Sequence, residues 1–307
     1  MGPIADEHGL EQGGCNSSDN YKVYNNELLD TVQSSCQGVN LRNNQIISGV
    51  GQADDAALSA NNIFNLFNIL HLALNYCRNY HVELAPEKSK LLLLTSNPDQ
   101  KFVPYNPLKI KDQPIDFSNQ AEHVGVLRST EGNLPHILGR IVAHKKALGS
   151  VLFCGAARNH RGNLAAAIKI EKLHAMPVLF SGVASLVLSN SEVNLLDQHY
   201  TCTLRNLLKA NVSTPRSFVF FMFGSLPAKA LLHLRLLSLF SMITRLPDDP
   251  LNTRARYVLT AHQHSSKSWF KKLRETSLLY GLPHPLSLLE NPPLKGFLQK
   301  TLQECGN

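Results

Sequence analysis

Two adjacent aspartates, Asp54 and Asp55, constrain the fold of this chain more than any other feature of its sequence. They lie between the segment 45–50 (QIISGV), which has the composition of a β-strand, and the segment 56–58 (AAL), which can return beside it. The pattern predicts a β-hairpin with both carboxylates at its turn. Aspartate is common in solvated turns, so a purely structural role is the first interpretation.

The surroundings of the two aspartates favour a second interpretation. No lysine or arginine lies within ten residues of either one. Two carboxylates held a few ångströms apart repel each other unless a cation bridges them. Mg²⁺ binds carboxylate and phosphate oxygens together, and a pair of such ions can drive nucleotidyl transfer. The hairpin is therefore a candidate Mg²⁺ site.

The pattern of apolar residues changes near residue 130. Before it, we expect a helix over 63–80 and short strands at 82–84, 91–94 and 122–129. After it, one helical pattern follows another. The first carries an apolar stripe of Ile137, Leu138, Ile141, Leu148 and Leu152, with Arg140, His144 and Lys145 on its other faces. Further core stripes are expected at 196–208 and 231–240. The sequence thus predicts an α+β chain whose second part is all helical.

Charge is unevenly distributed along the chain, whose net charge is +7. Residues 1–60 carry eight acidic groups against Lys22 and Arg42, whereas residues 128–172 carry eight basic groups against Glu131 and Glu171. A solvated helix face is the commoner origin of such a basic segment. The excess nevertheless favours a polyanionic partner such as nucleic acid.

The order of four segments resembles a known family. The strand–Ala-Asp-Asp–strand pattern resembles the metal-binding hairpin of reverse transcriptases. Upstream, 9–29 (GLEQGGCNSSDNYKVYNNELL) resembles their Gln-Gly turn and following helix. Downstream, 79–94 (NYHVELAPEKSKLLLL) resembles the helix end, lysine-bearing loop and strand that come next, and 122–129 (EHVGVLRS) the segment on the primer side. Over nearly its whole length the chain is most similar to reverse transcriptases of non-LTR, LINE-type retrotransposons.

This resemblance implies a fold and an activity. It implies a partial polymerase palm at 1–129, a thumb-like helical region at 130–210 and a C-terminal helical region at 211–307. The activity would be RNA-directed DNA polymerisation by two-metal nucleotidyl transfer. The implied partners are an RNA template, a DNA primer and dNTP, and the implied cofactor is Mg²⁺.

The resemblance also implies roles for individual residues. Asp54 and Asp55 match the catalytic metal ligands. Lys88 matches the lysine that protonates leaving pyrophosphate, with a solvated loop lysine as the alternative. Gln12 and Gly13 match residues that line the nucleotide and template pocket.

Further matches concern the bound nucleic acid. Gly125 would let the backbone approach the primer, although glycine in a strand also marks bulges. The residues expected to contact nucleic-acid phosphates are Arg128, Arg140, Lys145, Lys146, Arg158 and Arg161.

Three departures from the family pattern bear on activity. Gln52 stands where an aromatic residue usually precedes Ala-Asp-Asp, and CNSS follows the Gln-Gly turn in place of Ser-Pro. The sequence also begins eight residues before Gly9, so we expect the earlier aspartate-bearing strand and the fingers to be missing. The chain alone would then be inactive unless a second chain completes the palm. The alternatives are a non-catalytic nucleic-acid-binding remnant and a helical protein that binds a partner through residues 215–300.

Other features point to the cellular setting. The six cysteines include no CxxC pair and no leader is evident, which predicts an intracellular, reduced protein in the nucleus or cytoplasm. The most apolar segment, 218–243, is interrupted by Pro227 and by charged residues, and is predicted to be a buried helix pair rather than a membrane span. His262 and His264 lack a second pair at zinc spacing, and Trp269 is expected in the core.

Overall fold

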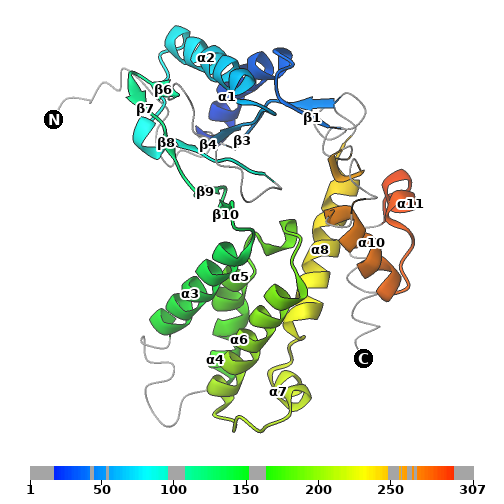
Figure 1. Cartoon of the computed structure of the whole chain (residues 1–307). Helices are drawn as coiled ribbons and strands as arrows, with labels where there is room; N and C mark the ends of the chain where they lie inside the picture. Colours follow the sequence, from blue (N-terminus) through cyan, green and yellow to red (C-terminus); the bar gives the residue numbers. More distant parts are fainter. Residues whose placement is uncertain are drawn as a thin grey trace, which may run out of the picture. The chain divides into compact units, whose positions relative to one another are not determined.

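The computed structural model of the chain describes residues 17–41, 45–52, 55–95, 108–151, 164–247, 256, 258–260, 265 and 268–293. The chain divides into two compact units, Met1–Val124 and Gly125–Asn307. Short strands and two helices make up the described part of the first unit, and helices dominate the second (Figure 1). The predicted α+β class is confirmed.

The first unit begins with a helix and alternates short strands with a second helix. Its elements are α1 (Ser17–Ser34), β1 (Val39–Leu41), β2 (Gln45–Ile47), β3 (Gly49–Gln52), β4 (Asp55–Leu58), α2 (Ile63–Asn79), a 3₁₀ turn (Pro86–Lys88), β5 (Lys90–Leu91), β6 (Lys109–Ile110), β7 (Gln113–Pro114), β8 (Asp116–Phe117) and β9 (Gln120–His123). Strands β1 and β2, β3 and β4, and β6 and β7 pair antiparallel, whereas β5 and β8 pair parallel.

The strand predicted at 45–50 is divided at Ser48. The Ser48 side chain is fully buried, and its backbone N–H donates to Gln33 Oε1 of α1 at 3.2 Å. Gln33 Nε2 donates in turn to the Ile46 carbonyl at 2.5 Å. The Gln33 side chain thus satisfies both the Ile46 carbonyl and the Ser48 N–H. At Ser48 the chain leaves its pairing with β1 and enters the β3–β4 hairpin.

The prediction of a strand at 82–84 is wrong, because these residues form none. The strand predicted at 91–94 is shorter and is found as β5 at Lys90–Leu91. His81 has a φ of +56° and the Val82 N–H donates to the Cys77 carbonyl at 2.8 Å. This is the pattern of a helix C-terminus closed by a left-handed residue. The backbone of Val82 therefore caps α2 instead of pairing in a sheet, and its side chain packs on the α1–α2 core.

The core of the first unit lies between its two helices. Leu28 and Val32 of α1 meet one face of α2, on which the predicted helical periodicity is confirmed. The buried α2 residues of this cluster are Ile69, Ala73, Tyr76 and Cys77. A smaller cluster joins Leu70 of α2 to Leu108, which precedes β6, and to Ile110 of β6.

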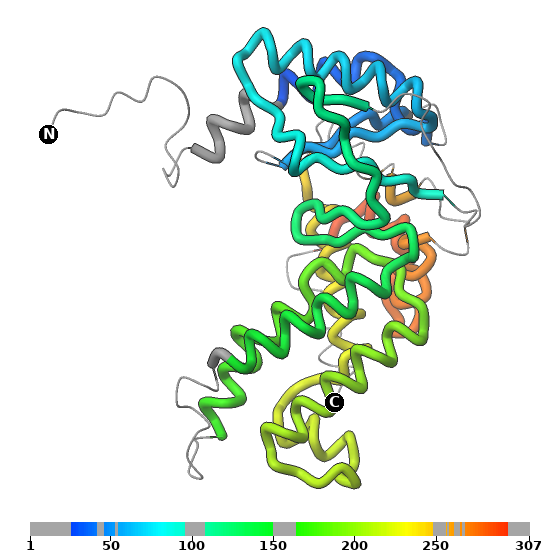
Figure 2. Tube along the Cα trace, turned by 60° about the vertical axis from the view of Figure 1, so that its left-hand side comes forward, coloured from blue at the N-terminus to red at the C-terminus, as the bar shows by residue number. Residues whose placement is uncertain are grey.

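The second unit is a set of packed helices, traced in green through red in Figure 2. Its elements are β10 (Val126–Ser129), α3 (Leu134–Val151), α4 (Leu164–Ile170), a π-helical segment (Glu171–Ala175), α5 (Met176–Leu179), a 3₁₀ turn (Val183–Ser185), α6 (Asn190–Leu208), α7 (Arg216–Phe223), α8 (Ala228–Thr244), α10 (Trp269–Leu279) and α11 (Pro285–Glu290).

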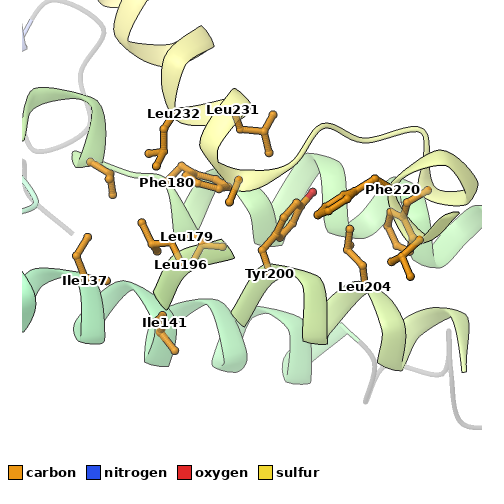
Figure 3. Packing of buried hydrophobic residues seen from close by; sticks show 14 residues of the cluster. Ile137, Ile141, Leu179, Phe180, Leu196, Tyr200, Leu204, Phe220, Leu231 and Leu232 are labelled. Carbon is orange, nitrogen blue, oxygen red and sulfur yellow. The ribbon is translucent and has the colours of Figure 1, made fainter. Parts of the chain in front are cut away.

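The main core of this unit is built from α3, α5, α6, α7 and the first half of α8, whose apolar side chains point toward one another (Figure 3). Tyr200 lies fully buried among them, with its ring edge-on to Phe180 at a centroid distance of 5.9 Å. Its hydroxyl is 2.8 Å from Ser225 Oγ, and burial raises the pKa of Tyr200 to about 12. The predicted stripes on α6 and α8 are confirmed by the burial of Leu196, Tyr200, Leu204, Leu231, Leu232, Leu236, Leu237 and Phe240.

The predicted stripe on α3 needs a correction. Ile137 and Ile141 are buried, but Leu138 is 47% exposed and His144 is fully buried. Because 137, 141 and 144 follow helical spacing, His144 lies on the inner face and Leu138 is turned about 100° away from Ile137. Leu152 lies outside the described residues.

A second core joins the last half of α8 to α10 and α11. Its buried residues include Phe240 of α8, Phe270 and Leu273 of α10 and Leu288 of α11. Trp269, predicted to lie in the core, is half-buried and packs against this cluster. Its Nε1–H donates to the Ala184 carbonyl at 2.8 Å.

Within the described part of the chain, no single helix is long and apolar enough to cross a membrane. By length and composition alone, α7 and α8 together pass that test as a pair bent by 53°.

Candidate functional site

The β3–β4 hairpin has one face covered by α1. Its register pairs Gly49 with Leu58 and Gly51 with Ala56, so these four residues share a face. A Cβ atom added at Gly51 would lie 3.2 Å from Leu29 Cδ1, and one at Gly49 would lie 3.5 Å from Val32 Cγ1. The two glycines thus leave room for the α1 side chains to lie directly on the strand.

The other face of the hairpin carries Asp55. The register pairs Gln52 with Asp55 and Val50 with Ala57, which places these residues opposite the α1 side. Asp55 is exposed and opens β4, and Val50 is 49% exposed. The predicted hairpin is therefore confirmed, with Asp55 as the first residue of the returning strand. Asp54, the other predicted ligand, lies outside the described residues, as do Gln12 and Gly13.

Lys88 ends the 3₁₀ turn that follows α2, and its side chain is exposed. Pro86 at the start of this turn fixes φ near the helical value, and the Lys88 N–H donates to the Ala85 carbonyl at 3.3 Å. No hydrogen bond or ion pair joins Lys88 to Asp55 in the described structure. A lysine here offers a positive charge and a proton to a phosphate oxygen, provided that a substrate brings the two sites together.

The sequence predicts Gly125 within a strand at 122–129, but the structure places it in a tight turn. Val124 and Gly125 have φ values of +52° and +71°, and β9 ends and β10 begins on either side of them. A left-handed turn favours glycine because it lacks a Cβ atom. Apart from its chain neighbours, no atom of the described residues lies within 4 Å of the position where a Cβ of Gly125 would stand.

The predicted phosphate contacts divide into three groups. Arg128 on β10 and Lys145 and Lys146 on α3 are exposed. Arg140 is half-buried on α3, and its Nε atom is buried without a hydrogen-bond partner in the described structure. Arg158 and Arg161 lie outside the described residues. The α3 segment 134–151 contains no acidic residue, so its exposed lysines have no carboxylate neighbour on their own helix.

Among the described residues, no group of three or more His, Cys, Asp and Glu side chains comes together to hold a metal ion. Asp55 alone of the predicted ligand pair falls in this part of the chain.

The sequence interpretation missed a buried polar cluster in the second unit, formed by His144, Glu171 and His199. His144 and Glu171 are both fully buried, and their side chains lie 3.2 Å apart. The apolar stripe of α3 predicts His144 on another face of the helix, and nothing in the sequence marks the π-helical segment that begins at Glu171. One sequence signal was available for the burial of Glu171: it lies four residues from Ala167 and from Ala175, on the same helix face, and both alanines are buried.

Comparison of the chain with protein-family models, with curated proteins and with solved structures finds no match.

Proposed function

We propose that this chain carries the later palm motifs and the thumb of an RNA-directed DNA polymerase of the non-LTR retrotransposon type. In this proposal the first unit is the palm part, and helices α3 to α6 form the thumb. The observation that carries it is the hairpin geometry. Asp55 opens β4 on the face that α1 leaves uncovered, directly after Asp54.

The chemistry proposed for the hairpin is metal-assisted phosphoryl transfer. Carboxylates of Asp54 and Asp55 would bind Mg²⁺, which also binds the phosphate oxygens of a dNTP. Two ions about 3.5–4 Å apart would lower the pKa of a primer 3′-hydroxyl and stabilise the leaving pyrophosphate. Lys88 would neutralise the leaving group. A further carboxylate is needed to bridge two ions, and no group of three metal-binding side chains is present among the described residues.

Calorimetric titration with Mg²⁺ tests the metal site. We expect weak binding to the wild-type chain that is lost in Asp54→Asn and in Asp55→Asn, because each substitution removes a charged oxygen ligand at constant size. Asp112→Asn is the matched control, since Asp112 is an exposed aspartate of the first unit that lies in the turn between β6 and β7. Equal Mg²⁺ binding by the wild type and both hairpin variants would contradict the assignment.

Primer extension on an RNA template tests the activity separately. Extension by the wild type that is abolished in Asp54→Asn and retained in Asp112→Asn would establish a working polymerase. Mg²⁺ binding without extension would indicate that the hairpin binds metal but that the catalytic group is not completed by this chain.

A second candidate function is nucleic-acid binding without catalysis. It is favoured by the exposed Lys145 and Lys146 on a helix that has no acidic residue. Each lost phosphate contact lowers the slope of log affinity against log salt by about one. We therefore expect Lys145→Ala/Lys146→Ala to weaken binding to an RNA–DNA hybrid and to reduce that slope by about two.

The matched control is Lys109→Ala/Lys111→Ala, which removes two lysines from the β6–β7 hairpin of the first unit. Fluorescence anisotropy with a labelled hybrid at several salt concentrations gives both slopes. Binding that is independent of salt, or that falls equally in the two double variants, would contradict a specific role for α3. Binding unchanged by Asp54→Asn would separate this function from catalysis.

A further inference from the structure

A hydrogen-bonded chain of three side chains crosses the interior of the second unit. His144 of α3 lies between Glu171 of the π-helical segment and His199 of α6. Its Nε2 atom is 3.2 Å from Glu171 Oε1, and its Nδ1 atom is 2.9 Å from His199 Nε2. His144 and Glu171 are fully buried, whereas His199 is half-buried. These hydrogen bonds therefore connect the core of the second unit to a histidine that solvent reaches.

The Glu171 carboxylate determines which ring nitrogen of His144 has a lone pair that is available to bind a metal. A carboxylate only accepts hydrogen bonds. The Nε2 atom of His144 therefore carries a proton and donates it in a hydrogen bond to Glu171 Oε1. In the tautomer that carries its proton at Nε2, the lone pair of His144 is at Nδ1, which faces His199. This is the arrangement by which a carboxylate orients a metal-binding histidine from behind.

The position of Glu171 has a cost that packing alone does not explain. Burying a carboxylate is unfavourable unless it is paired and fully hydrogen-bonded. Glu171 Oε2 is buried without a hydrogen-bond partner in the described structure. Glu171 also begins a π-helical segment, and single π-helical turns are frequent at functional sites. Both features indicate that the carboxylate serves the histidine in front of it.

The two histidine nitrogens face each other at close to the separation that one metal ion requires. With Zn–N bonds of about 2.0–2.1 Å and tetrahedral angles, two ligand nitrogens lie about 3.3 Å apart. The nitrogens of His144 and His199 are 2.9 Å apart, and the ring planes are nearly perpendicular at 85°. To admit an ion, the hydrogen bond would open by a few tenths of an ångström and both rings would turn so that the two lone pairs point at the ion. His199 would shift its proton from Nε2 to Nδ1, which changes neither its charge nor that of the protein.

We propose that His144 and His199 bind a divalent transition-metal ion such as Zn²⁺, with Glu171 orienting His144 and water completing the coordination. Imidazole nitrogen is a preferred ligand of Zn²⁺, Ni²⁺ and Cu²⁺ and a poor one of Mg²⁺, so this site differs in chemistry from the β3–β4 hairpin. Among the described residues no group of three or more metal-binding side chains comes together, so the protein would supply only two ligands here.

The charges around the site act in both directions. Glu171 supplies a negative charge behind His144. Lys145, which follows His144 on α3 and acts electrostatically on His199, places a positive charge near the site. Lys145 also repels a bound cation. Lys145→Ala should therefore tighten metal binding, by a factor of two or more.

Calorimetric titration of the full chain with Zn²⁺ at pH 7.5 is the experiment. We expect binding in the wild type and at least tenfold weaker binding in His199→Ala, which removes a half-buried ligand without opening the core. Glu171→Gln should weaken binding about 10–100-fold, the usual effect of removing such a supporting carboxylate. Circular dichroism of each variant checks that it is folded.

His174→Ala is the matched control, because His174 is exposed in the same π-helical segment. The chain has 13 histidines, so the comparison among variants is decisive rather than the amount of metal bound. Unchanged Zn²⁺ affinity in His174→Ala and weakened affinity in His199→Ala support the proposal. Equal affinity in the wild type and His199→Ala, equal losses in both variants, or no binding to the folded wild type would each overturn it.

Discussion

Replacing Gly38 with alanine should destabilise the first unit. Gly38 precedes β1 and does not have a positive φ, so the backbone conformation itself accepts alanine. A Cβ atom there would instead overlap the carbonyl group of Ile47 and come within 2.5 Å of Ser48 Cα. Backbone atoms cannot rotate away as a side chain can. The strands must therefore separate where β2 gives way to β3.

The expected loss follows from two opposing effects. Forcing one methyl group into a closely packed site costs about 1–3 kcal/mol. Replacing glycine by alanine recovers about 0.4–1 kcal/mol by restricting the unfolded chain. The free energy of unfolding should therefore fall by about 1–2 kcal/mol. With a urea dependence of about 1–3 kcal/mol per molar, the midpoint should fall by roughly 0.3–2 M.

The measurement uses the single tryptophan, Trp269, which lies in the second unit. Its fluorescence follows unfolding of that unit, while circular dichroism follows both units. Gly139→Ala is the control, because outside the backbone of its own helix no atom of the described residues lies within 4 Å of its Cβ position, and alanine should stabilise helix α3 by about 0.5–1 kcal/mol. Gly38→Ala should lower the circular-dichroism midpoint alone, and Gly139→Ala should raise the tryptophan midpoint. An unchanged circular-dichroism transition in Gly38→Ala would refute the steric argument.

Three further predictions concern the second unit, each read from the urea midpoint of Trp269 fluorescence. Leu196→Ala should lower stability by about 2.7–5 kcal/mol because Leu196 is fully buried in the main core, and a loss below 1 kcal/mol would mean that the core collapses around the gap. Ser189→Ala should cost about 1 kcal/mol because Ser189 forms a capping box at the start of α6, and an unchanged midpoint would show that water replaces the cap. Burial and then nearby Lys229 and Lys272 lower the pKa of His233 from 6.5 to about 4, so the unfolded state binds the proton more readily. The stability contributed by neutral His233 is present above pH 6.5 and is lost as the pH falls toward 4. The midpoint should therefore decrease from pH 7 to pH 5, and by less in His233→Asn; equal decreases would contradict this.

Much of the fold follows from local sequence patterns. The hairpin around Asp54 and Asp55, the helix over 63–80 and the core stripes of α6 and α8 are all set by apolar periodicity and turn residues, which the sequence displays directly. The helix that ends at Gly281 is of the same kind, since Gly281 has the left-handed φ of +62° that a helix end favours.

The failures come from contacts between residues distant in sequence. Ser48 looks like the middle of a strand, and only the amide of Gln33, fifteen residues earlier, divides that strand. Val82 has strand composition, but its backbone N–H is taken by the end of α2. The stripe that includes Leu138 predicts His144 on another face of α3, whereas Glu171 and His199 give it partners inside the core. The functional role of the hairpin itself stays a prediction.

Helix α8 belongs to both cores of the second unit. Its residues Ala228, Leu231 and Leu232 lie in the cluster with α3 and α6, and Leu236, Leu237 and Phe240 lie in the cluster with α10 and α11. One continuous helix cannot unravel at one end of its buried length without weakening the other. The two clusters should therefore unfold in a single cooperative transition. A proteolytic cut between α8 and α10 that released the later helices would destabilise the α3–α6 bundle, although no residue of that bundle had been removed.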